Sequence, residues 1–140
     1  MTFRLSARSL KSLEGVHPDL VKVVKRAIQI TDIDFVVIEG RRTPARQAEL
    51  VKAGASKTMK SRHLTGHAVD IVPLLGGKVR WDWPLYQSLA LAIKKAAIDK
   101  SVPVEWGGDW RTFKDGPHWQ LPRSEYPDVT IVQPRRVLTA

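Results

Sequence analysis

The densest group of potential metal ligands lies in residues 61–70, SRHLTGHAVD, which contain His63, His67 and Asp70. The chain of 140 residues has four histidines and no cysteine. A zinc site in it would therefore need histidine and carboxylate ligands. A catalytic zinc site commonly takes three protein ligands and keeps one position for water. The first question is which of these side chains can reach one ion.

The spacing of His63 and His67 would place both on one face of a helix, as in metallopeptidases with the HExxH motif. Gly66 interrupts such a helix, and Leu64 stands where that motif carries its glutamate base. From His67 onward the segment instead alternates as a strand, so His67 and Asp70 point to opposite faces. We therefore expect His63, from the preceding loop, to join Asp70 as a ligand, with His67 outside the ligand group.

A third ligand has to come from His17 or His118, the two remaining histidines. His17 precedes an expected helix and is suited to a capping role. His118 lies in an expected strand, HWQL, in which Trp119 packs to the opposite face. Asp115 precedes His118 across a Gly-Pro turn. A carboxylate there could accept a proton from a metal-activated water, as a general base does.

The surrounding pattern predicts short strands mixed with helices. Apolar residues recur at helical spacing, and Thr43 followed by Pro44 is a typical helix start. Short β-branched runs indicate strands, and the Gly-Gly pair in LLGGKVRWDW indicates a hairpin turn. Because helices and strands do not alternate regularly, the pattern favours an α+β fold over a doubly wound sheet. Helices are expected at 6–15, 17–30, 43–54 and 84–100, and strands at 34–39, 67–73, 102–106 and 118–121.

Composition narrows the classes of protein further. A hydrophobic content of 43% in 140 residues suits one folded domain. No apolar run approaches the roughly 18 residues of a membrane span, and the N-terminus lacks the apolar stretch of a signal peptide. The net charge of +9 favours an anionic partner such as nucleic acid, acidic lipid headgroups or a cell-wall polymer. No zinc-finger or RNP-like motif supports nucleic acid.

Together these motifs resemble those of a known family. The pattern S-x-H-x-x-G-x-A-x-D at 61–70, followed by D-x-x-H at 115–118, is similar to the motif of zinc peptidases that cleave peptidoglycan peptides. This is the family of D-Ala-D-Ala carboxypeptidases and L-alanyl-D-glutamate endopeptidases. The segment GRRT at 40–43, with Gln47, is similar to the family's Arg-Ser/Thr…Gln segment. The resemblance spans roughly residues 15–121.

The resemblance implies one zinc ion per chain, held by His63, Asp70 and His118, with Asp115 as the catalytic base. It also implies a small α+β domain, like that of hedgehog proteins and D-Ala-D-Ala peptidases. In that fold a short antiparallel sheet carries the zinc site and helices flank the sheet.

The resemblance assigns three further residues to the substrate. Arg42 would bind it or stabilise the oxyanion that forms during hydrolysis. Ser61 and Gln47 would be substrate-binding residues. Asp109 and Asp115 are the only aspartates in the stretch EWGGDWRTFKDGPH, which argues against the calcium regulation that an Asp-rich loop gives some phage relatives.

Within the family the chain looks most like bacteriophage endolysins that cut the L-alanyl-D-glutamate bond of peptidoglycan stem peptides. We expect a monomer with one catalytic domain over 1–140, a core at about 15–121, a tail at 122–140 and no separate wall-binding domain. The basic surface would contact an anionic wall or lipopolysaccharide. Without a signal peptide, the protein would stay in the host cytoplasm until its release to the periplasm and cell wall.

Two alternatives within this fold remain open at this point. A D-Ala-D-Ala carboxypeptidase or dipeptidase would use the same zinc chemistry on a different bond. A non-catalytic binding module would keep the zinc site, as hedgehog signalling domains do, although the presence of Asp115 argues against it.

Overall fold

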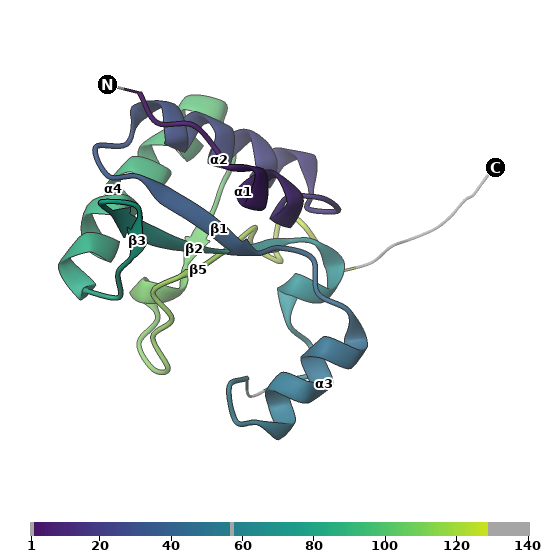
Figure 1. Ribbon diagram of the computed structural model, residues 1–140. Coiled ribbons are helices and arrows are strands. Elements are labelled where there is room, and N and C mark those ends of the chain that lie inside the picture. The colour runs from purple at the N-terminus through teal and green to yellow at the C-terminus, as the bar shows by residue number, and fades with distance from the viewer. Residues whose placement is uncertain (1, 57, 129–140) are drawn as a thin grey trace.

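The computed structural model describes residues 2–56 and 58–128, and it confirms the expected α+β class (Figure 1). Each expected helix and strand is present, in some cases shortened, as with the strand expected at 102–106. Two short 3₁₀ helices, η1 and η2, are additional. The elements are α1 Ala7–Ser12, α2 Pro18–Ile30, β1 Phe35–Glu39, α3 Pro44–Lys52, η1 Arg62–Thr65, β2 Ala68–Leu75, β3 Lys78–Val79, α4 Trp83–Lys100, β4 Glu105–Trp106, η2 Gly107–Asp109 and β5 His118–Gln120.

One antiparallel sheet positions the central part of the molecule. Its strand order is β1-β2-β5-β4, and β3 pairs with the far end of β2 through a hairpin. The register places Asp70 of β2 opposite His118 of β5 on one side and opposite Glu39 of β1 on the other. A register shift between Val37 and Glu39 marks a bulge in β1. Strand pairing alone therefore brings three residues of the site together.

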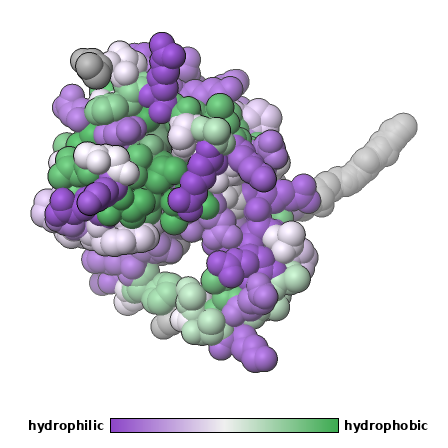
Figure 2. Space-filling view, viewed as in Figure 1, coloured by the Kyte–Doolittle hydropathy of each residue, from purple (hydrophilic) through white to green (hydrophobic). Residues whose placement is uncertain are grey.

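The hydrophobic core lies between the sheet and the helices α2 and α4, which pack against each other. Val69 and Ile71 of β2 are fully buried in this core, whereas Asp70 between them points away from it, as the alternation of a strand requires. The segment that carries α3 extends away from the helical layer (Figure 1). On the face shown in Figure 2, the surface is hollowed between this segment and the rest of the domain.

The segment after β5 is fastened to the domain by Arg62, whose side chain is only 2% exposed. Its guanidinium donates hydrogen bonds to the carbonyl oxygens of Leu121 and Tyr126 and pairs with Asp128 at 2.6 Å. Tyr126 also donates its hydroxyl to Asp19 of α2 at 2.7 Å. The first residues of the expected tail therefore pack on the domain, while 129–140 lie outside the described residues. No helix among the described residues is long and apolar enough to cross a membrane.

The buried hydroxyl of Ser9 joins α1 to the outer edge of the sheet. Its oxygen accepts the backbone N–H of Val37 at 2.9 Å, and the Ser9 side chain is fully buried. Because β1 is an edge strand, this N–H has no neighbouring strand to receive it. Ser9 therefore satisfies a buried donor that the sheet leaves unpaired.

We predict that Ser9→Ala lowers the free energy of unfolding by about 1–3 kcal/mol, because it leaves the buried N–H of Val37 without an acceptor. Urea unfolding followed by circular dichroism measures the change. Ser88→Ala, on the exposed face of α4, is the matched control and should stay within about 0.5 kcal/mol of the parent. Equal effects of the two substitutions would contradict the role given to Ser9.

Candidate functional site

A cleft with a volume of about 610 Å³ opens beside the sheet. Its walls come from the end of α3, the loop into η1, strand β2, the loop before β5, and β5 itself. The candidate residues His63, Asp70, His118, Asp115 and Arg42 all line it. The residues assigned to chemistry from the sequence therefore meet in one concave site.

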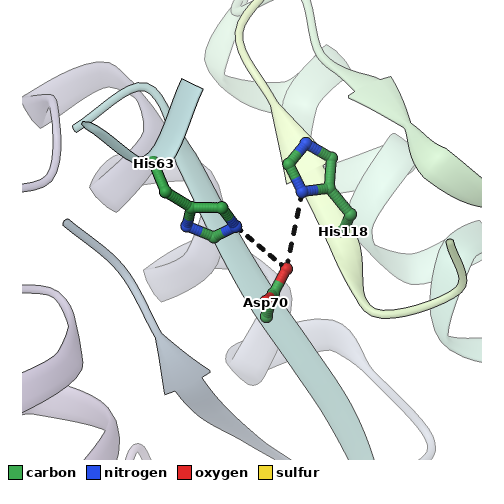
Figure 3. A group of neighbouring side chains, drawn as sticks. All are labelled: His63, Asp70 and His118. Carbon is green, nitrogen blue, oxygen red and sulfur yellow. Dashed lines mark hydrogen bonds and ion pairs between the residues drawn. The ribbon is translucent and has the colours of Figure 1, made fainter. Parts of the chain in front are cut away.

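His63, Asp70 and His118 form a compact group in this cleft (Figure 3). Each offers one ligand atom, and these atoms lie within 4.8 Å of one another. Nε2 of His63 is 3.2 Å from Oδ1 of Asp70, and Nδ1 of His118 is 3.5 Å from the same oxygen. Across residues 2–56 and 58–128, this is the one group of three or more such side chains close enough to hold a metal ion.

The position of His63 depends on the short helix η1. Ser61 begins this helix, and its hydroxyl oxygen accepts the backbone N–H of His63 at 3.2 Å. Gly66 ends it with φ +78°, in the left-handed region. Nδ1 of His63 lies 2.8 Å from the carbonyl oxygen of Gly40, to which it can only donate. This bond fixes the tautomer and leaves the Nε2 lone pair directed at the site.

His118 is held in the complementary way by its neighbour on β5. Its Nε2 lies 2.7 Å from Oε1 of Gln120, and the amide of Gln120 donates to Glu105 on β4 at 2.9 Å. Nε2 therefore carries the proton, and Nδ1 turns its lone pair toward Asp70. Two imidazoles with fixed tautomers and one carboxylate make a donor set that fits a divalent transition metal.

The charge on Asp70 is stabilised within the buried site. Burial alone would raise the pKa of this carboxyl, but its close contacts with the imidazoles of His118 and His63 hold it well below its usual range. Burial lowers the pKa of His118, and its contact with Asp70 reverses this effect, so that the net direction is upward. Asp70 is therefore ionised at neutral pH, as a metal ligand must be.

Asp115 is brought to the cleft by a close approach between two backbone segments. Its N–H donates to the carbonyl oxygen of Gly107 at 3.0 Å, and its own carbonyl accepts from His118 at 3.2 Å. A Cβ atom at position 107 would lie 2.4 Å from the Asp115 carbonyl oxygen, so glycine is needed there. Burial and the nearby charge of Asp70 raise the pKa of Asp115.

Arg42 is a fixed and nearly buried cation at the edge of the ligand group, with 8% of its surface exposed. Nη1 donates to Oε1 of Gln47 and Nη2 to Oε1 of Glu39, each at 2.7 Å. The same Nη2 lies 3.6 Å from Oδ2 of Asp70. Nε is buried and has no hydrogen-bond partner among the described residues.

Two residues expected at the substrate differ in where the structure places them. Ser61 lines the cleft, besides capping η1. Gln47 is fully buried behind Arg42 and does not line the cleft. Its amide donates to Ser56 and to the carbonyl oxygen of Thr58, which ties the loop after α3 to the site.

The other two histidines lie outside the ligand group. Nδ1 of His17 accepts the backbone N–H of Asp19 and caps α2. The ring of His67 faces those of His17, with 5.5 Å between centroids, and Tyr126. The structure thus places both where the strand alternation and the helix start suggested.

Comparison with known proteins identifies the family. The profile of phage L-alanyl-D-glutamate peptidases matches residues 1–121. The chain belongs to this family. A curated member, the L-alanyl-D-glutamate peptidase of Escherichia phage T5, is 32% identical over 130 residues, which cover 90% of this chain and 94% of the relative. The resemblance inferred from the motifs is therefore confirmed.

Further relatives of this peptidase family come from a second phage and from bacteria. The L-alanyl-D-glutamate peptidase of Listeria phage A118 is 36% identical over 134 residues, covering 94% of this chain but only 47% of the relative. The chain thus spans about half the length of that protein. The crystal structure of Serratia marcescens L-Ala D-Glu endopeptidase ChiX matches with a TM-score of 0.85 and 51% identity, covering 89% of this chain and 94% of ChiX.

The supporting residues of this peptidase site were the part that sequence reasoning missed. Gln120 and Glu105 orient His118, and Glu39 orients Arg42. Glu39 ends β1 and Glu105 begins β4, and carboxylates at strand ends are commonly solvated residues without a partner in the site. One pattern in the sequence could have revealed the role of Gln120. It stands two positions from His118 in the expected strand, and side chains two positions apart lie on the same face of a strand.

We predict that Gln120→Leu lowers the affinity of the site for a divalent metal by about 10–100-fold, because His118 loses the partner that fixes its tautomer. Zinc, as the probe metal, is titrated against a competing chelator. Gln87→Leu, on the exposed side of α4, should leave the affinity unchanged. Unaltered zinc affinity in Gln120→Leu would show that the hydrogen bond to His118 does not support the ligand.

Proposed function

We propose that this protein is a zinc-dependent peptidoglycan endopeptidase that hydrolyses the L-alanyl-D-glutamate bond of stem peptides. The observation that carries the proposal is the convergence of His63, Asp70 and His118 within 4.8 Å in the cleft of a chain from this family. The names of the relatives supply the bond, and the cleft supplies room for an extended peptide beside the ligand group.

The three ligand residues would hold the zinc ion through Nε2 of His63, a carboxylate oxygen of Asp70 and Nδ1 of His118. Zinc bound there would supply a Lewis acid, which polarises a carbonyl and lowers the pKa of a water molecule to about 7. The hydrogen bonds that the two imidazoles donate to Gly40 and Gln120 would keep each ring in the tautomer that presents a lone pair to the metal. The fold thus prepares the site before the metal arrives.

Asp115 would act as the general base. It lines the cleft, and its backbone is held next to that of His118. Its raised pKa makes its carboxylate a better proton acceptor than an exposed aspartate. It would take a proton from the attacking water and return it to the amine of the departing glutamate residue.

Arg42 would stabilise the negative charge that develops on the scissile carbonyl oxygen. A cation held in place before the reaction is effective in this role because it does not need to reorganise. Gln47 supports this function from behind by fixing Nη1, so we assign it to positioning Arg42 and not to direct contact. Ser61 would contact substrate from the cleft wall.

Digestion of purified peptidoglycan tests the proposal. The protein is incubated with sacculi with and without a zinc chelator, and the soluble products are identified by mass spectrometry. We expect metal-dependent cleavage that leaves glutamate as a new N-terminus. Release of a terminal D-alanine would instead support the carboxypeptidase alternative, and intact sacculi under both conditions would contradict peptidase activity.

We predict that Asp115→Asn keeps stoichiometric zinc and lowers kcat by about 10²–10⁴-fold, because the amide cannot accept the proton. Zinc content and turnover of a soluble muropeptide are measured on the same preparation. Asp32→Asn, an exposed aspartate before β1, is the control and should retain full activity. Near-normal turnover in Asp115→Asn would remove Asp115 from the base role.

We also propose that the net charge of +9 draws the protein, acting as a monomer, to the anionic wall or to lipopolysaccharide after its release from the host cytoplasm. Salt shortens the range of this attraction, from a Debye length of about 10 Å at 0.1 M to about 3 Å at 1 M. Raising the salt concentration should therefore slow the lysis of whole sacculi more than the cleavage of a small soluble muropeptide. Equal salt sensitivity of the two rates would contradict this attraction.

A further inference from the structure

We propose that Lys60 forms a subsite for the free carboxylate of the glutamate residue on the amine side of the scissile bond. The inference rests on the proposed function and adds a determinant of specificity to it. The observation that carries it is that Lys60 lines the cleft and its ammonium has no carboxylate partner among the described residues.

The arginines that line the cleft are already committed to acceptors on the protein. Arg42 pairs with Glu39 at 2.7 Å and lies near Asp70. Arg62 pairs with Asp128, and its Nε and Nη2 donate hydrogen bonds to backbone carbonyl oxygens. Arg123, at the rim, donates to the carbonyl oxygen of Lys60 and lies 3.6 Å from Asp128.

Lys60 differs from these three cations. It lines the same cleft and is exposed, and its ammonium has no carboxylate or hydrogen-bond partner within the part of the chain that the structure describes. An anionic group that enters the cleft would meet this charge without displacing a protein carboxylate. The ammonium on its flexible stem can adjust to such a group.

The backbone of Lys60 is nevertheless fixed on both sides. Its N–H donates to the Thr58 hydroxyl at 2.9 Å, and its carbonyl accepts from Arg123 at 2.7 Å. The next residue, Ser61, caps the helix that carries His63. The point from which the lysine side chain extends is therefore tied to the ligand group, while the side chain itself remains free to reach into the cleft.

The chemistry of the proposed substrate would favour such a cation. A glutamate that is joined onward through one carboxyl keeps its other carboxylate free, only a few bonds from the amine that departs. Asp70, Asp115 and Glu39 also line the cleft, so a bound glutamate carboxylate would meet like charges, which are costly where water is excluded. Because Arg42 is balanced by Glu39, Lys60 is the lining residue placed to offset the additional charge.

The test compares two muropeptides that differ in one group, a free glutamate carboxylate or the corresponding carboxamide. The zinc-loaded protein, Lys60→Gln and Lys60→Arg are assayed for kcat and KM on both. We expect Lys60→Gln to raise KM for the carboxylate substrate about 5–10-fold, to leave the carboxamide substrate unchanged, and to be rescued by Lys60→Arg. Lys52→Gln, on α3 but outside the cleft lining, is the matched control.

Binding measured without turnover provides a second readout. In the Asp115→Asn background, calorimetry should show the same loss of affinity for the carboxylate substrate when Lys60 is replaced. A Lys60→Gln variant that weakens both substrates equally, or that keeps the wild-type preference, would overturn the inference while leaving the peptidase proposal intact. A wild-type protein that cleaves neither substrate would overturn both.

Discussion

The pairing of β2 with β5 is the constraint on which the site depends. In this register Asp70 lies opposite His118, and Trp119 lies on the other face of the same strand. Trp119 is 2% exposed and stacks on Trp106, with 5.6 Å between ring centroids. A slip by one residue would turn Trp119 into the cleft and His118 into the core. Burial of the large apolar surface of Trp119 is favourable in free energy and selects this register. The register in turn fixes the geometry of His63, Asp70 and His118.

The loops that complete the site are held by close backbone approaches. A Cβ atom at Gly66 would lie 2.4 Å from the carbonyl oxygen of Gly15, and one at Gly40 would lie 2.0 Å from that of Ser12. The carbonyl of Gly40 can therefore face His63 while its Cα packs closely against the last residue of α1, Ser12. The N-terminal segment, which contributes no ligand, acts as the support against which the His63 loop is placed.

Strand alternation and spacing were sufficient to separate the histidines, but not to assemble the site. Alternation from His67 onward placed that residue away from Asp70, and the structure agrees. The capping role of His17 and the strand position of His118 favoured His118 as the third ligand, but the register between β2 and β5 is a long-range property that no local pattern encodes. The resemblance, and not a local pattern, placed Gln47 at the substrate. Its burial behind Arg42 depends on how α3 packs, which its sequence neighbours do not specify.

The residues around the three candidate ligands set the charge balance of the site. Glu39, Asp70 and Asp115 bring three carboxylates to one cleft, and Arg42 is the fixed cation among them. Burial raises the pKa of Asp115, and the negative charge of Asp70 raises it further. The proposed base is therefore the carboxylate of this group that binds a proton more readily than an exposed aspartate does. A dication in the ligand group would offset that excess. The same arrangement that makes Asp115 a proton acceptor therefore also favours the binding of a metal.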